Sequence, residues 1–328
     1  MHDVIIIGAG PAGLAVGIEA VKNGLDTIVI EKGTVVNSIV NFPKEMVFFS
    51  TSDLLEIGKM PFTSNGSHPT RREAILYYQK AADYHNLRIN PREKVTAIRH
   101  LEESFEIQST PWPDAINGKK SIYKSQNVVI ATGFYDYPKR LNVQGEDLPN
   151  VSHYYSEPYT YYNKDVLIIG GGNSAVEAAL DIFRHGGRVT VLHRAPEVKK
   201  SIKYWILPDF QNRVAEGSIK LIANAEVLEL KHDGVSYKQL NKTKWHPCDD
   251  VLLLTGYQPD EEIYNLAGIG YNKETLEPTI NQNTFESTQK GIYLAGSLIA
   301  GVFSNRIFIE NSREHAQPIV EDILKREK

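Results

Sequence analysis

Two glycine-rich turns are the features of this sequence that most clearly predict ligand binding. The first, Gly8-Ala9-Gly10-Pro11-Ala12-Gly13, follows the apolar run Val4–Ile7 and precedes a helical stretch from Leu14 to about Lys22. Gly8 permits a tight turn, Gly10 lets the backbone approach a pyrophosphate, and Gly13 lets helix and strand pack closely. The start of the helix offers unpaired N–H groups and a positive dipole end. The pattern therefore predicts a dinucleotide site.

The residue that closes the next strand selects the nucleotide. Thr27–Glu31 is predicted to be that strand, and Glu31 stands eighteen positions after Gly13. A carboxylate here accepts hydrogen bonds from ribose hydroxyls and repels a 2′-phosphate, so this turn is predicted to hold FAD or NAD and not NADP. The residues predicted to bind FAD are Gly8, Gly10, Pro11, Ala12, Gly13, Glu31, Lys32, Thr132, Gly133, Gly296 and Ser297.

The same pattern returns half a chain later. A predicted strand at Asp165–Ile169 leads into a second glycine turn, a helix to about His185 and a further strand. No acid ends that strand; Arg194 stands there, which suits the 2′-phosphate of NADPH. The alternatives are a solvated surface cluster of Arg194 with Lys199 and Lys200, and a His193 that points into the sheet. The residues predicted to bind NADPH are Gly170, Gly172, Asn173, Ser174, Ala175, His193 and Arg194.

The repeated unit sets the expected architecture. Val128–Ile130 runs into Ala131-Thr132-Gly133, and Val251–Leu254 runs into Thr255-Gly256, so each is predicted to close the sheet that its glycine turn opens. The fold class is α/β, with two Rossmann-like dinucleotide-binding domains of the three-layer ββα type, the second inserted in the first. The FAD-binding domain is predicted to comprise 1–136 and 259–328, and the NADPH-binding domain 137–258. We expect a β-meander at 99–127, with a loop at 110–114 and 117–118, a strand and turn at 291–300, and a helical tail from 305.

Composition excludes several classes of function. The 328 residues carry a net charge of −4 and no basic cluster large enough for nucleic acid. No apolar run is long enough to span a bilayer, and the N-terminal apolar stretch is broken by glycine and proline at once. Cys248 is the only cysteine, so no intrachain disulfide can form. These features predict a cytoplasmic protein without a metal site.

Longer stretches add a family resemblance. The motifs GAGPAG, ATG, GGGNSA and TGYQPD are similar to those of the low-molecular-weight thioredoxin-reductase-like flavoproteins. Asn41-Phe42-Pro43 and the segments 48–62, 201–208 and 307–311 resemble the bacillithiol-disulfide reductase family. The resemblance implies FAD at the first turn and NADPH at the second, with NADPH-driven reduction of the symmetric disulfide of a small thiol.

Two positions depart from the family pattern. Ala12 stands where the family often carries a cysteine, and Ser297 where the wider superfamily usually has an aspartate facing the flavin. We expect the backbone N–H groups of Gly296 and Ser297 still to hold phosphate. Cys248 precedes Gly256 by eight residues at the start of a strand, roughly 25 Å from the nicotinamide end at about 3.3 Å per residue. It is predicted to be a bystander, and no catalytic residue is assigned.

The cofactors are thus better specified than the electron acceptor. The chain has no C-x-x-C, which excludes dithiol relay to thioredoxin. The leading hypothesis is NADPH-dependent reduction of a low-molecular-weight disulfide. The alternatives are a ferredoxin- or flavodoxin-type reductase, a flavin monooxygenase, and a redox or nucleotide sensor without turnover. The partner is therefore a small-molecule acceptor or a small protein carrier, and the oligomeric state, including a homo-oligomer, is left open.

Overall fold

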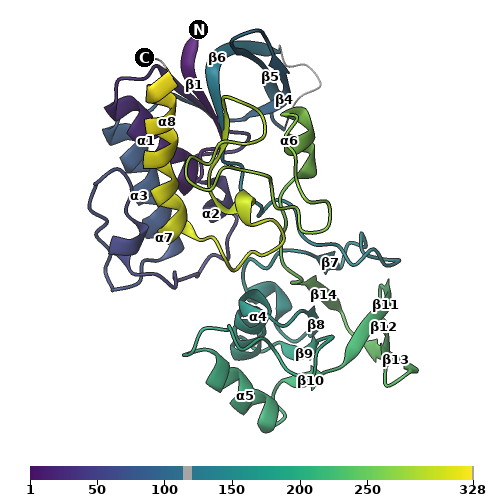
Figure 1. Cartoon of the computed structure of the whole chain (residues 1–328). Helices are drawn as coiled ribbons and strands as arrows, with labels where there is room; N and C mark the ends of the chain where they lie inside the picture. Colours follow the sequence, from purple (N-terminus) through teal and green to yellow (C-terminus); the bar gives the residue numbers. More distant parts are fainter. Residues whose placement is uncertain (114–119, 327–328) are drawn as a thin grey trace. The chain divides into compact units, whose positions relative to one another are not determined.

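The chain divides into two compact units, each built on its own sheet (Figure 1). A computed structural model describes residues 1–113 and 120–326. Unit 1 comprises Met1–Asn41, Met46–Tyr137 and Tyr257–Lys328, and unit 2 comprises Phe42–Glu45 and Pro138–Gly256. The short segment 42–45 joins unit 2, which the predicted domain limits had not included. The assignment of the two domains to FAD and NADPH stays a prediction.

Unit 1 contains a seven-stranded sheet in the order β3-β2-β1-β6-β5-β4, with β15 also paired to β6. Its strands are β1 (His2–Ile7), β2 (Thr27–Ile30), β3 (Ile89–Asn90), β4 (Glu93–His100), β5 (Phe105–Pro111), β6 (Ser121–Ile130) and β15 (Ile292–Leu294). β4, β5 and β6 pair antiparallel as the predicted meander, and the remaining pairs are parallel. The predicted loop residues Asp114, Asn117 and Gly118 lie outside the described residues.

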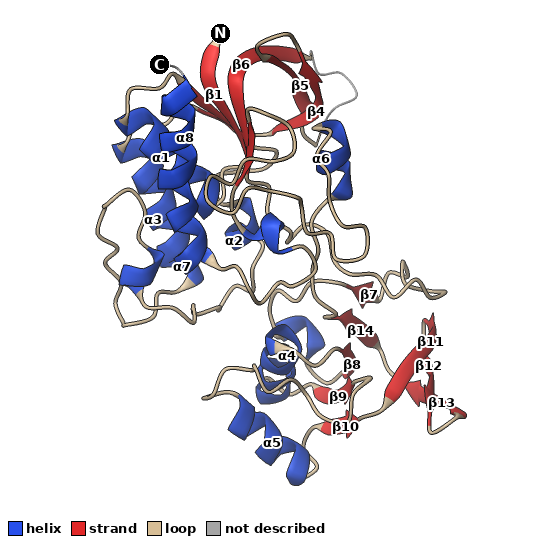
Figure 2. Cartoon of the chain, in the orientation of Figure 1, coloured by secondary structure: helices blue, strands red, loops and turns tan. Residues whose placement is uncertain are grey.

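Helices cover one face of this sheet. α1 (Pro11–Lys22), α3 (Arg71–Tyr84) and α8 (Ala316–Arg326) lie side by side there, drawn blue in Figure 2. Ile5 and Ile7 of β1 belong instead to a core that also contains residues of the meander and of α6 (Glu261–Leu266). β1 is apolar at every position from Val4 because both of its faces are buried. The shorter helices are α2 (Asn37–Val40), η1 (Ser52–Leu55), η3 (Ser297–Ala300), α7 (Ile309–Ser312) and η4 (Arg313–His315).

Unit 2 contains a five-stranded parallel sheet between two different layers. Its order is β10-β9-β8-β14-β7, with β7 (Val151–Ser152), β8 (Asp165–Ile169), β9 (Arg188–Leu192), β10 (Lys220–Ile222) and β14 (Asp250–Leu253). α4 (Asn173–Arg184) and α5 (Leu207–Ala215) pack on one face. A three-stranded antiparallel sheet packs on the other, formed by β11 (Ala225–Lys231), β12 (Gly234–Gln239) and β13 (Lys242–Pro247). A short helix, η2 (Tyr159–Tyr161), precedes β8. The three-layer ββα prediction is confirmed.

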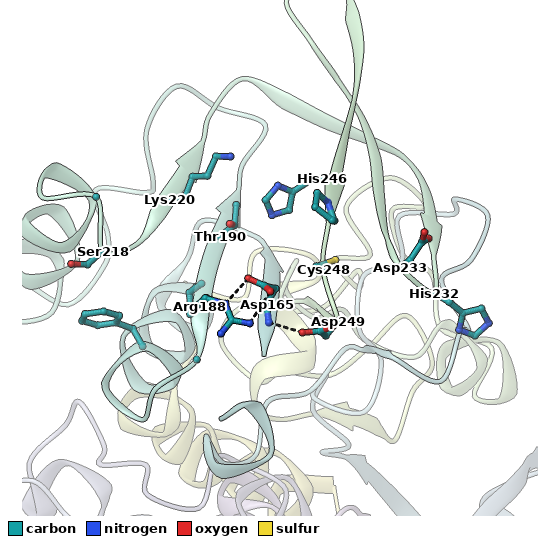
Figure 3. Close-up of a pocket in the computed structure, with 15 residues that line it drawn as sticks. Asp165, Arg188, Thr190, Ser218, Lys220, His232, Asp233, His246, Cys248 and Asp249 are labelled. Carbon is teal, nitrogen blue, oxygen red and sulfur yellow. Dashed lines mark hydrogen bonds and ion pairs between the residues drawn. The ribbon is translucent and has the colours of Figure 1, made fainter. Parts of the chain in front are cut away.

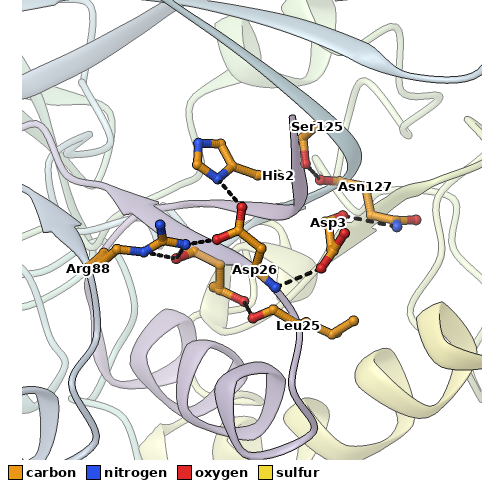
Figure 4. A network of polar contacts seen from close by, with 8 residues as sticks. His2, Asp3, Leu25, Asp26, Arg88, Ser125 and Asn127 are labelled. Carbon is orange, nitrogen blue, oxygen red and sulfur yellow. Dashed lines mark hydrogen bonds and ion pairs between the residues drawn. The ribbon is translucent and has the colours of Figure 1, made fainter.

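A polar network joins the starting ends of the strands in unit 1 (Figure 4). Asp26, just before β2, accepts hydrogen bonds from Nδ1 of His2 at 2.9 Å and from Arg88. Asn127 of β6 donates to the carbonyl of Asp3 at 3.2 Å. Partial burial opposes ionisation of Asp26, but the bonds from Arg88 and His2 outweigh it and lower the pKa of that carboxyl. The network ties the starting ends of β1 and β2 to Arg88 and to Asn127 of β6.

No helix among the described residues has the length and apolar character needed to cross a membrane. In unit 1, Tyr264 of α6 links the segment that follows unit 2 to η3. Its ring is fully buried, and its hydroxyl donates to the carbonyl of Leu298 in η3 at 2.8 Å.

Tyr264→Phe is expected to lower the free energy of unfolding of unit 1 by about 1–2 kcal/mol, because the buried carbonyl of Leu298 loses its donor. Urea denaturation followed by circular dichroism measures this. Tyr271→Phe is the matched control, since the Tyr271 hydroxyl bonds to the exposed carboxylate of Glu261. Equal losses in both variants would contradict the assignment.

Candidate cofactor-binding sites

The first glycine turn is packed against the end of a neighbouring strand. Gly8 has φ of 107°, and a Cβ there would lie 2.6 Å from the carbonyl oxygen of Ala131, just past β6. A Cβ on Gly13 would overlap the carbonyl oxygen of Gly8. Side chains at either position would push the turn away from the sheet. Both glycines are therefore required by the chain's own packing.

Gly10 differs, because the described residues leave open space where its side chain would stand. A Cβ there would meet no atom within 4 Å, and its φ of −73° is open to any residue. Gly10 is the N-cap of α1, and its own side chain cannot cap the helix. The free space at this helix start is what a phosphate needs for close approach. The geometry thus fits the predicted dinucleotide.

Glu31 is buried beneath the turn and takes part in building it. Its two carboxylate oxygens accept backbone N–H groups of Ala9 and Gly33, each at 2.7 Å. Burial raises the pKa of Glu31, against the two hydrogen bonds, which lower it. Each carboxylate oxygen has a second lone pair, so bonds to ribose hydroxyls remain possible. Lys32 is held by an ion pair with Asp136 at 2.9 Å.

Two more predicted segments lie beside the first turn. A Cβ on Gly133 would lie 3.5 Å from Oγ of Ser297, and one on Gly296 would lie 3.0 Å from Cβ of Ala12. Oγ1 of Thr132 is buried without a hydrogen-bond partner. A polar ligand bound beside the turn would supply the partner that this hydroxyl lacks. The fold thus brings together the three segments predicted to bind FAD.

The backbone at Gly296 has a partner within the chain. The N–H of Gly296, expected to hold phosphate, donates to Nδ1 of His315 at 3.2 Å. The His315 ring is stacked on Phe285 with ring centres 4.2 Å apart. Burial lowers the pKa of His315 to about 4, which keeps Nδ1 available as an acceptor. The phosphate contacts of the Gly296 and Ser297 N–H groups stay a prediction, and a phosphate at Gly296 would have to replace the bond to His315.

The second glycine turn, in unit 2, is packed against its sheet in the same way as the first. A Cβ on Gly170 would lie 2.5 Å from the carbonyl oxygen of Leu254 and 3.1 Å from Cβ of Ala175. Ala175 is fully buried at the position of the third glycine. Gly172 faces open space, with no atom within 4 Å of a Cβ placed there. The start of α4 is therefore accessible to a second dinucleotide in the same way.

Of the residues predicted to bind NADPH, some make contacts within the second turn and others are exposed around it. A Cβ on Gly171 would overlap the ring of His193, so His193 covers the turn and does not point into the sheet core. Oδ1 of Asn173 accepts the backbone N–H of Lys203 at 2.9 Å, which fixes the following loop. Ser174 and Arg194 are exposed. Burial, with the positive charges of Arg194 and Lys199, lowers the pKa of His193.

A separate cavity of about 700 Å³ lies at the opposite, starting ends of the strands of unit 2 (Figure 3). Arg188 and Asp165 there form two hydrogen bonds, at 2.8 and 2.9 Å. Cys248 is buried at its wall, and burial, with nearby aspartates, raises its pKa to about 12. The thiol is therefore protonated at neutral pH. It lies at the starting ends of the strands, opposite the glycine turn. The described residues contain no cluster of three His, Cys, Asp or Glu side chains that could hold a metal.

The open and the packed glycines of the first turn should respond differently to a methyl group. Gly10→Ala is expected to leave the free energy of unfolding of the apoprotein within about 0.5 kcal/mol of wild type but to weaken FAD binding about tenfold or more. Gly13→Ala is expected to cost about 1–3 kcal/mol of stability, because it overlaps the Gly8 carbonyl. Urea denaturation and FAD titration measure the two effects. A destabilised Gly10→Ala with normal FAD affinity would contradict the assignment of the open space.

His315 should make unit 1 sensitive to acid. Its pKa in the folded state, about 4, lies below the ordinary value of 6.5, so its contribution to stability is complete above pH 6.5 and is lost as pH falls towards 4. From pH 7 to pH 5 the loss is about 2 kcal/mol at most. His315→Asn keeps an acceptor for Gly296 without a titrating ring, so its stability should vary less over this range. Identical pH slopes in urea denaturation would show that His315 is not the source.

Comparison with known proteins agrees with this geometry. Residues 5–296 match the family model described as pyridine nucleotide-disulphide oxidoreductase. Bacilliredoxin reductase Bdr of Bacillus subtilis is 40% identical over 327 residues, which cover 99% of this chain and 98% of that protein.

Two solved structures of bacillithiol disulfide reductase Bdr (YpdA) are also similar over nearly their whole length. The one from Bacillus cereus is 39% identical with a TM-score of 0.96 and covers 99% of both chains. The one from Staphylococcus aureus is 38% identical with a TM-score of 0.93, covering 100% of this chain and 99% of that one. The predicted resemblance is confirmed, and the chain is an oxidoreductase that belongs to the pyridine nucleotide-disulphide oxidoreductase family.

Proposed function

We propose that this protein binds FAD at the first glycine turn and NADPH at the second, and reduces the disulfide of a low-molecular-weight thiol of the bacillithiol class. The observation that carries the proposal is the near full-length similarity to bacilliredoxin reductase, joined to two glycine turns whose middle glycine faces open space. Each open glycine lies at the start of a helix, where a pyrophosphate gains most from the N–H groups.

Each part of a flavin dinucleotide would find a suitable group in unit 1. Glu31 would accept the ribose hydroxyls, Gly10 would face the pyrophosphate, and the Thr132 hydroxyl would gain the partner that it lacks in the chain. In unit 2, Gly172 would face the pyrophosphate and Arg194 the 2′-phosphate. When bound, FAD and NADPH supply the hydride chemistry, which needs no protein acid or base in its first half.

The net conversion takes one disulfide, NADPH and a proton to two thiols and NADP⁺. No protein thiol is placed to mediate it. Cys248 is protonated and lies at the far edge of the unit 2 sheet. Position 12 carries a buried methyl group against Gly296. The substrate disulfide would therefore have to meet the flavin directly.

Ala12 also favours a second candidate function, electron transfer to a ferredoxin- or flavodoxin-type carrier. Such a transfer needs no thiol in the glycine turn, so Ala12 leaves it intact. The two candidates share both cofactor sites and differ only in the acceptor. They are therefore separated by what reoxidises the reduced protein.

The test is anaerobic reduction of the FAD-loaded protein by NADPH, followed by addition of bacillithiol disulfide. We expect NADPH to bleach the flavin absorbance and the disulfide to restore it with release of two thiols. Cys248→Ser is the control and should behave as wild type, because its buried thiol lies at the starting ends of the unit 2 strands, opposite the second glycine turn. Reoxidation by ferredoxin or flavodoxin but not by the disulfide would favour the second candidate. A flavin that NADPH does not bleach would favour a cofactor-binding sensor.

A further inference from the structure

Lys139 is fixed beside the second glycine turn by contacts that the sequence does not reveal. Its backbone N–H donates to the carbonyl of Gly256 at 2.8 Å, and its carbonyl accepts the hydroxyl of Thr255 at 2.6 Å. Its side chain runs along the same turn, with Cδ 3.9 Å from where a Cβ on Gly256 would lie. Lys139 is thus anchored at both backbone groups to the end of β14.

Thr255-Gly256 lies next to the glycine turn. β14 pairs with β8 over Asp250–Leu253, and Gly170 lies so close to the end of β14 that a Cβ would be 2.5 Å from the Leu254 carbonyl. On the other side of β8, β9 ends at Leu192 and leads to Arg194. The glycine turn is therefore flanked by a cation on each side.

These cations are close enough to act on one another. The Lys139 side chain is half-buried, and burial lowers its pKa, followed by the positive charges of Lys199 and Arg194. Lys199 is itself held at the turn, since its backbone N–H donates to the carbonyl of Gly171 at 2.8 Å. Gathering three like charges costs free energy. The cost is recovered when a multiply charged anion binds among them.

We infer that Lys139 binds the pyrophosphate of NADPH, a role separate from the 2′-phosphate contact of Arg194. The inference rests on the proposed function and deepens it. In a βαβ dinucleotide site the adenosine ribose lies by the strand after the glycine turn, and the pyrophosphate lies at the turn itself. Arg194 follows that strand, β9, whereas Lys139 lies on the side of β14. The 2′-phosphate is thus nearer Arg194, and the pyrophosphate, at the turn itself, lies within reach of Lys139 on the other side.

The test compares two ligands that differ in the pyrophosphate. NADP⁺ carries both the pyrophosphate and the 2′-phosphate, whereas adenosine 2′-monophosphate carries only the latter. With the FAD-loaded protein, Lys139→Met is expected to weaken NADP⁺ about tenfold and leave adenosine 2′-monophosphate unchanged. Arg194→Met is expected to weaken both. Calorimetry measures NADP⁺, and NMR titration measures the weaker ligand.

Two further variants separate a direct contact of Lys139 with the ligand from a general effect of positive charge. Lys220→Met also removes one positive charge, but at the first residue of the edge strand β10, away from the glycine turn. It should change the affinity for neither NADP⁺ nor adenosine 2′-monophosphate. Lys139→Arg keeps the charge and should restore most of the NADP⁺ affinity. A Lys139→Met variant that binds NADP⁺ as wild type does, or that loses both ligands equally, would overturn the inference alone. Failure of the wild type to bind NADP⁺ would overturn the proposed function as well.

Discussion

Both candidate cofactor sites depend on one steric constraint, the close approach of a glycine to a carbonyl at the end of the neighbouring parallel strand. At Gly8 a Cβ would lie 2.6 Å from the Ala131 oxygen, and at Gly170 it would lie 2.5 Å from the Leu254 oxygen. Each close approach packs the turn against the end of the neighbouring strand and leaves no room for a side chain there. The middle glycines then face free space, which is where a phosphate can approach. The rest of each site is arranged around this contact.

The two turns share their steric design and differ in their charges. Beneath the first, a buried carboxylate from Glu31 accepts two backbone N–H groups and so forms part of the scaffold. Around the second, the exposed Arg194 stands with Lys139 and Lys199, whose charges act on one another. A negative group inside one site and positive groups about the other predict that the two turns select different nucleotides.

The described part of neither unit places a thiol at its glycine turn. Ala12 presents a buried methyl group to Gly296, and the Gly296 N–H is already bonded to His315. The only thiol, Cys248, is protonated and lies at the far edge of its sheet. The chain thus keeps the scaffold of the pyridine nucleotide-disulphide oxidoreductase family while its first glycine turn carries no thiol.

The sequence by itself determined the elements whose signals are local: both strand–turn–helix units, the strands that close each sheet, and the contrast between Glu31 and Arg194. It did not reveal the antiparallel sheet of β11, β12 and β13, whose short strands carry many polar residues. It also missed His315 and Lys139. His315 meets Gly296 from 19 residues away, and Lys139 meets Thr255 from 116 residues away. Such contacts are set by how strands and helices pack in three dimensions, and no spacing along the chain records them.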